Sequence, residues 1–324
     1  MKKPSLCFMR TVCILLALLL LSALLSACGP SVSSSRPETE KNQGDNKLDY
    51  PYLVHTASST WYLAAADLEL LGEDAYYAGL YEILENLELD FADAREALKG
   101  YIPEEIPPID IYTDFSENGE ITKLTDAYYL DEDNYIKLLI GWRDAGKALL
   151  HEYVHYLTKH CTEKPATYGF YAEGIAEYIS KLVCKNRMAR RVNMVFSEEE
   201  LLLLKAHGAW DEAEDCIDLV KTYYGQAEFF AQGRGVGIEV YTVTNTTEPR
   251  TEEMQQNLTV NTVSHFEAAC ILAYLVETDS MDTVMKSLST DPEEIETIYG
   301  VPFSEIYRNW AVWNAKKCAE LGIN

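Results

Sequence analysis

Apolar residues recur at helical spacing in the first third of the chain. They lie three or four positions apart in the segment that Gly100 ends: Leu80, Ile83, Leu84 and Leu87. This spacing places the apolar side chains on one face of a half-buried helix. The pattern predicts helices over 57–71 and 73–99, within an N-terminal helical region at 48–104.

The same helical pattern returns in the second half of the chain. It predicts helices at 175–190, 197–207 and 209–224. Between them and the next apolar run, residues 231–263 are polar and rich in Gly and Thr. We expect a loop with at most one strand there, because such residues favour turns and loops.

The amino terminus has a different pattern. Three basic residues precede the apolar stretch 12–25, and small residues then lead to Cys28. A basic start, a short apolar core and a small-residue cleavage site are typical of a secretory signal. The stretch is shorter than the about 20 apolar residues of a membrane-spanning helix. We interpret 1–27 as a signal peptide; the alternative is an uncleaved anchor helix.

The segment Leu25-Ser26-Ala27-Cys28 resembles the bacterial lipobox. The resemblance implies cleavage before Cys28 and a diacylglycerol on its sulfur, which anchors a protein to a membrane without spanning it. Residues 28–47 contain little that could be buried, so we expect them to form a flexible tether. The folded part would then lie outside the cytoplasm, held at the cell membrane by lipid.

Charge excludes one class of partner. The formal net charge is −25 at pH 7, and removal of residues 1–27 makes it more negative. An acidic surface repels nucleic acid, so we expect no nucleic-acid partner.

The chain has eight cysteines, five of them after Cys28. Five cannot all pair within one chain, so at least one has no intramolecular disulfide.

Residues 151–155, His-Glu-Tyr-Val-His, are the strongest candidates for chemistry. Residues four apart on a helix share a face, so His151 and His155 can offer two imidazole nitrogens to one ion. A catalytic zinc takes three protein ligands and keeps a fourth position open. Glu173 is the candidate third ligand. Glu152 would be the general base that takes a proton from the attacking water.

The flanking residues favour a metal site. Between positions 148 and 158 the only charged residue is Glu152, as a buried metal helix requires. The alternative is a core helix whose histidines make ordinary hydrogen bonds, because such short motifs also occur by chance.

Glu177 shares a helix face with Glu173 and could orient a ligand histidine, or be a solvated surface charge. Gly174 would let this helix approach a neighbour closely.

Two segments, Leu-His-Glu-Tyr-Val-His at 150–155 and Tyr-Ala-Glu-Gly-Ile-Ala-Glu-Tyr at 171–178, resemble the gluzincins, a family of zinc metallopeptidases in peptidase clan MA. Members carry HExxH followed by a glutamate in an EGxAxY context. The resemblance extends over about 105–317. It implies one zinc ion bound by His151, His155 and Glu173, with Glu152 as catalytic base.

The resemblance also implies a fold. We expect an α+β, zincin-like domain at 105–324, in which a small mixed sheet precedes the active-site helix. Segments 109–112 and 134–140 resemble strands of that sheet. The helical lobe would occupy about 161–324.

The chain departs from the family in two places. It lacks the Gly-x-Met-x-Asn segment with which aminopeptidases bind a free amine, so exopeptidase activity is unsupported. Where members often place a tyrosine that stabilises the oxyanion, the chain has His265. His265 is therefore a candidate catalytic residue, and a polar histidine at a helix start is the alternative. Three tyrosines are other candidate donors: Tyr241, Tyr274 and Tyr299.

These observations predict a lipid-anchored, extracytoplasmic zinc metallopeptidase that acts as an endopeptidase on peptides or proteins. The alternative in another class is a catalytically inactive zincin-fold lipoprotein that binds a partner or a cell-wall component. A substrate-binding lipoprotein of a transporter would need two lobes rich in βαβ units, and the helical patterns do not predict them.

Overall fold

The computed structural model describes residues 38–115, 127–130, 133–139, 141–161, 169–184, 187, 205, 210–211, 216–225, 252–288, 290 and 294–323. The predicted signal peptide and Cys28 lie outside these residues. Pro37–Asn324 make up one compact unit. Within the described part, no helix is long and apolar enough to cross a membrane.

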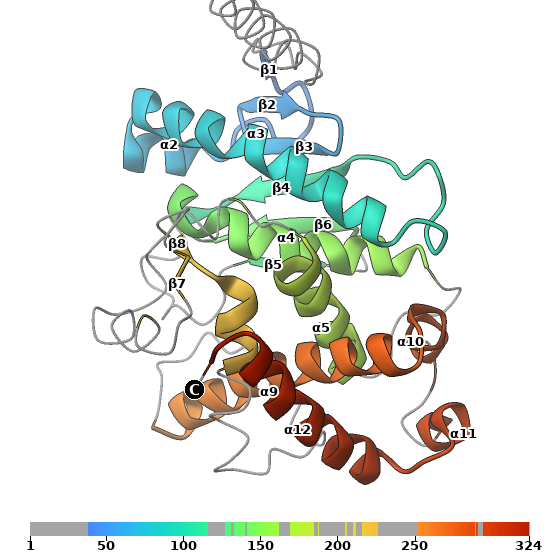
Figure 1. The fold of residues 1–324 in the computed structure, drawn as a ribbon. Helices are drawn as coiled ribbons and strands as arrows, with labels where there is room; N and C mark the ends of the chain where they lie inside the picture. The colour runs from blue at the N-terminus through green and yellow to red at the C-terminus, as the bar shows by residue number, and fades with distance from the viewer. Residues whose placement is uncertain are drawn as a thin grey trace, which may run out of the picture. The chain divides into compact units, whose positions relative to one another are not determined.

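A six-stranded mixed sheet forms the first half of this unit (Figure 1). Its strands in spatial order are β1 (Thr39–Lys41), β2 (Tyr52–His55), β3 (Ser59–Leu63), β4 (Ile109–Thr113), β6 (Tyr135–Leu138) and β5 (Ala127–Leu130). Strands β3, β4 and β6 are parallel, and β5 pairs antiparallel with β6 at the edge. Parallel neighbours need a crossover, which α2 (Ala65–Leu71) and α3 (Glu73–Ala97) provide between β3 and β4.

The predicted helix at 57–71 is wrong in its first half, which is strand β3. Residues alternate there between buried and half-buried positions, and Trp61 and Leu63 are fully buried. Ser-Thr-Trp-Tyr-Leu is rich in residues that favour strands, and the sheet provides the partners. The second half, α2, and the predicted helix at 73–99 are confirmed.

The sheet also changes the expected boundaries. Strand β1 pairs with β2 although it lies inside the predicted tether 28–47, so regular structure begins before residue 48. Strands from both sides of residue 105 share the sheet, so the N-terminal region does not form a separate domain. The strands expected at 109–112 and 134–140 are present as β4 and β6.

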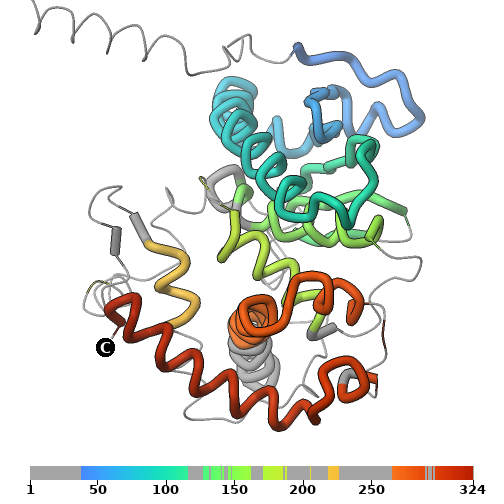
Figure 2. The backbone as a smooth tube through the Cα atoms, turned by 45° about the vertical axis from the view of Figure 1, so that its right-hand side comes forward, coloured from blue at the N-terminus to red at the C-terminus, as the bar shows by residue number. Residues whose placement is uncertain are grey.

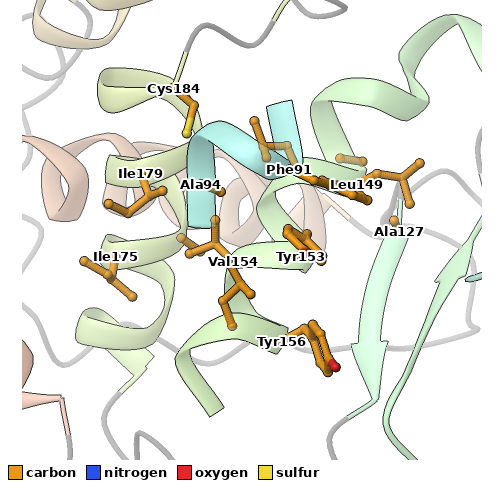
Figure 3. Packing of buried hydrophobic residues seen from close by; sticks show 14 of the residues in the cluster. Phe91, Ala94, Ala127, Leu149, Tyr153, Val154, Tyr156, Ile175, Ile179 and Cys184 are labelled. Atoms are coloured by element: carbon orange, nitrogen blue, oxygen red, sulfur yellow. The ribbon is translucent and has the colours of Figure 1, made fainter. Parts of the chain in front are cut away.

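Helix α4 (Trp142–Lys159) packs between α3 and the sheet edge. Phe91 of α3 stacks on Tyr153 of α4, with ring centroids 3.8 Å apart and both side chains fully buried (Figure 3). The rest of the buried face of α4 is apolar: Leu149, Leu150, Val154 and Leu157. This packing fixes the rotation of α4 about its axis, and therefore the direction in which its polar residues project.

The second half of the unit is mostly helical. It contains α5 (Gly169–Glu177), the π-helix η2 (Tyr178–Val183), α9 (Glu252–Thr278), α10 (Met281–Ser287), α11 (Ile295–Tyr299) and α12 (Phe303–Glu320). Helix α5 packs against α9, and α9 also contacts α12 (Figures 1 and 2). A Cβ atom on Gly174 would lie 2.9 Å from Leu272 Cδ1 and 3.2 Å from Ala268 Cβ. The close approach expected at Gly174 is therefore confirmed.

Two segments between 209 and 263 differ in part from their predictions. Helix α9 begins at Glu252, inside the interval 231–263 that we expected to be a loop; its Thr and Asn residues obscured the helical pattern. The segment 209–224 includes two short paired strands, β7 (Trp210–Asp211) and β8 (Cys216–Ile217), before a helical turn at 219–225. The predicted helix at 197–207 lies outside the described residues except for Lys205. The α+β class itself is confirmed.

Candidate metal centre

Two helices bring three donor side chains together. Helix α4 carries His151 and His155 one turn apart, and α5 carries Glu173. The Nε2 atom of His151 lies 3.0 Å from Nε2 of His155 and 3.1 Å from Oε2 of Glu173. His155 Nε2 and Glu173 Oε2 are 3.3 Å apart. The structure therefore brings together the three residues predicted as metal ligands.

These separations fit a zinc ion. Zinc binds histidine nitrogen and carboxylate oxygen tetrahedrally at about 2.0–2.2 Å, which places neighbouring donor atoms about 3.3–3.6 Å apart. The observed separations of 3.0 to 3.3 Å are within a few tenths of an ångström of that range. Imidazole nitrogens with one carboxylate are also a donor set that zinc accepts. Three protein ligands leave one position open, as in catalytic zinc sites.

The electrostatics of the cluster favour a bound cation. Burial lowers the pKa of His151, but its contacts with Glu173 and Glu177 outweigh burial and raise that pKa to about 10. Burial raises the pKa of Glu173, while His155 and His151 outweigh it and hold that pKa well below its usual value. The buried carboxylates therefore stabilise positive charge at this point, and a divalent metal supplies that charge as a proton does.

Glu152 lies beside these ligands without joining the group of mutually close donors. Its Oε2 accepts a hydrogen bond of 2.8 Å from the backbone N–H of Tyr129 in edge strand β5. Burial raises the pKa of Glu152, although the charges of His151 and His155 oppose that shift. A carboxylate with a raised pKa is suited to accept and return a proton near neutral pH.

Glu177 occupies the far side of His151. Its Oε1 lies 2.9 Å from Nδ1 of His151, and its Oε2 accepts a hydrogen bond from the hydroxyl of Tyr223. The Glu177 side chain is 12% exposed, which differs from the solvated surface charge considered as the alternative. Sequence reasoning missed Tyr223. Its neighbourhood carries no motif, and a contact across 46 positions cannot be read from local spacing.

The helix that carries both glutamates changes its geometry after Glu177. Residues Tyr178–Val183 form a π-helix instead of the continued α-helix predicted for 175–190. Lys181 in this π-helix is buried. Burial raises the pKa of Glu177, but the charge of Lys181 and the interactions with His151 and His265 together outweigh burial and lower that pKa. Single π-turns within helices often occur at functional sites.

His265 reaches the site from α9. Its Nε2 lies 3.1 Å from Oε2 of Glu173, and its ring centroid is 6.1 Å from that of His151. His265 lies in the interior of α9 and not at a helix start, because that helix begins at Glu252. It lies outside the group of three mutually close donors.

The alternative tyrosine donors are less well placed. The Tyr274 ring packs against Trp313, with centroids 5.7 Å apart, and the Tyr299 hydroxyl lies 3.2 Å from Oγ of Ser287. Tyr241 lies outside the described residues. Among the candidates that the structure describes, His265 is the one in contact with a predicted ligand.

No family model, curated protein or solved structure matches this chain. The interpretation of the site therefore depends on its own residues and geometry. Within the described residues, His151, His155 and Glu173 are the one group of three or more His, Cys, Asp or Glu that could hold a metal ion.

Proposed function

We propose that this chain is a zinc metallopeptidase of gluzincin type with a zincin-like fold, and that it acts as an endopeptidase. The observation that carries the proposal is the convergence of the His151, His155 and Glu173 donor atoms to within 3.3 Å of one another. The sheet with an antiparallel edge strand beside the metal helix also supports it.

The residues divide the chemistry among them. A zinc ion held by His151, His155 and Glu173 would polarise the scissile carbonyl and lower the pKa of a bound water. Glu152 accepts the proton of the attacking water and transfers it to the leaving amine. The ring N–H of His265 donates to the oxyanion that develops on the carbonyl oxygen.

The position of Glu152 supports an extended peptide as substrate. Strand β5 is at the edge of the sheet in the described part of the chain. The N–H of Tyr129 in this strand donates to Glu152. An extended peptide that added to β5 as a further strand would therefore pass the general base. This arrangement favours cleavage within a chain over removal of a terminal residue.

The test is a pair of measurements on the purified chain: zinc content, and cleavage of a mixed peptide library with and without a chelator. Glu152→Gln should keep the zinc and lose cleavage about 10²–10⁴-fold, because only the general base is removed. His151→Ala should lose both. Glu85→Gln, at an exposed position of α3, is the matched control and should change neither.

Two results would contradict the proposal. Full cleavage by Glu152→Gln would refute the assignment of the base. Wild-type protein that holds zinc and cleaves no library member would instead favour the catalytically inactive zincin-fold lipoprotein.

We also propose that lipid on Cys28 anchors the enzyme to the outer face of the cell membrane. The support is the sequence 25–28, which follows a basic and then an apolar segment. Cys28→Ala should move the protein from the membrane fraction to the soluble fraction and remove the mass of the lipid. An unchanged mass and fraction would contradict the lipid anchor.

A further inference from the structure

Tyr223 contacts the candidate metal centre indirectly, through Glu177. Its hydroxyl donates to Oε2 of Glu177, whose Oε1 lies 2.9 Å from Nδ1 of His151. We propose that Tyr223 is a positioning residue that fixes the Glu177 carboxylate, so that His151 directs Nε2 towards the metal. The inference depends on the metal site of the proposed function.

The two carboxylate oxygens of Glu177 contact different residues. Oε1 lies 2.9 Å from Nδ1 of His151, and a carboxylate at that nitrogen favours the tautomer whose Nε2 lone pair can bind a metal. The bond from Tyr223 to Oε2 stops the carboxylate from rotating about its last torsion. Without it, Oε2 would be a buried acceptor lacking this donor, and nothing described at Oε2 would hold the carboxylate in one orientation.

The Tyr223 ring has little freedom to leave this position. It is 6% exposed and meets the ring of Phe266 edge to face, with centroids 4.6 Å apart. Phe266 follows His265 on α9, so Tyr223 packs against the helix that carries the candidate oxyanion donor. A buried hydroxyl needs a partner, and here that partner is the carboxylate of Glu177.

The backbone next to Tyr223 is held by α12. The carbonyl oxygen of Tyr224 accepts hydrogen bonds from Nδ2 of Asn314 at 3.4 Å and from Sγ of Cys318 at 3.5 Å. Figure 2 shows the ochre turn that includes Tyr223 beside the red helix α12. At the start of the turn, Oγ1 of Thr222 donates to the carbonyl oxygen of Asp218 at 2.8 Å. The position of the hydroxyl is therefore set from outside the two ligand helices.

The experiment measures the zinc affinity of the purified full chain by competition with a chromogenic chelator. Tyr223→Phe removes only the hydroxyl and should weaken zinc binding about 10-fold, in the range found for groups that support metal ligands. Tyr224→Phe is the matched control: Tyr224 is equally buried, and its side chain packs against Trp313 instead of Glu177. It should bind zinc as the wild type does.

A double-mutant cycle separates positioning from general stability. Tyr223→Phe should have no further effect on zinc affinity when Glu177→Ala is already present, because the hydroxyl acts through that carboxylate. Thermal unfolding shows whether each variant remains folded. Should Tyr223→Phe not fold, the comparison moves to Tyr223→Gln and Tyr223→Leu, of which only the first keeps a donor and should retain the higher affinity.

The outcomes distinguish this inference from the proposed function. Wild-type zinc affinity in Tyr223→Phe, or an undiminished effect in the Glu177→Ala background, would overturn the role of Tyr223 and leave the metal site intact. Equal affinity of the Gln and Leu variants would do the same. A wild-type chain that binds no zinc would overturn both.

Discussion

The contact between α5 and α9 at Gly174 gives a sharp test of how the ligand helix is held. In Gly174→Ala the new methyl group would lie 2.9 Å from Leu272 Cδ1 and 3.2 Å from Ala268 Cβ. Both distances are below ordinary van der Waals contact. Leu272 is fully buried, and the Cβ of Ala268 is fixed to its backbone, so neither neighbour can move away freely. The helices must therefore separate slightly.

Two effects of opposite sign determine the magnitude. Excess volume in a packed core costs about 1–3 kcal/mol. Alanine in place of glycine within a helix stabilises by about 1 kcal/mol. We expect the free energy of unfolding to fall by about 1 kcal/mol, which lowers Tm by about 2–4 °C for a chain of this size. Because Glu173 is the adjacent residue, zinc affinity should also fall.

The assay is urea unfolding of the purified chain, with the unfolding free energy extrapolated to water. The same substitution in a second variant separates the steric clash from the other effects of alanine. In Leu272→Ala, where the nearest atom is gone, Gly174→Ala should no longer destabilise the protein. If Gly174→Ala instead increases stability in the wild-type background, α5 and α9 do not approach as closely as described, and the reasoning is refuted.

Three further predictions concern the core, the pH dependence of stability and the metal. Phe91→Ala should lower the unfolding free energy by about 3–5 kcal/mol in urea, because it removes the ring stacked on buried Tyr153; a loss below 1 kcal/mol would contradict that packing. Burial raises the pKa of Glu267 to about 7 against its hydrogen bond with Tyr307. The folded state then binds more protons than the unfolded state between about pH 4.5 and 7, so this group makes stability fall by up to about 3 kcal/mol as pH rises through that window. Glu267→Gln should remove this decline in urea unfolding at several pH values, and an unchanged profile would refute it. Zinc at about 100 times its dissociation constant should raise Tm by about 5–10 °C in thermal unfolding and leave His151→Ala unaffected; equal shifts in both would place the metal elsewhere.

Local spacing explains why the convergence of the candidate ligands could be predicted from sequence. His151 and His155 are one helical turn apart, and their position on an apolar helix was visible in the residues around them. Glu173 and Glu177 are likewise one turn apart, so one could face the metal and the other the ring of a ligand. The α+β class was expected from the family resemblance of segments 150–155 and 171–178.

Contacts between distant segments were not predictable in this way. The bond between Tyr129 and Glu152 depends on strand order, and β5 carried no alternation strong enough to be recognised. The alternative for His265, a polar histidine at a helix start, is wrong because α9 continues through the polar residues that precede it. Tyr223 meets Glu177 from a segment whose backbone is bonded to α12. Each of these depends on tertiary packing, which periodicity does not record.

The anchoring of the Tyr223 segment by Asn314 and Cys318 has a consequence for biogenesis. A polypeptide is made from its amino end, so residues 151–177 emerge well before residues 314–318. During synthesis the candidate ligands would exist without the hydroxyl that we propose to align them. We expect a nascent chain to acquire full zinc affinity, and with it the proposed peptidase activity, only after its final helix has docked.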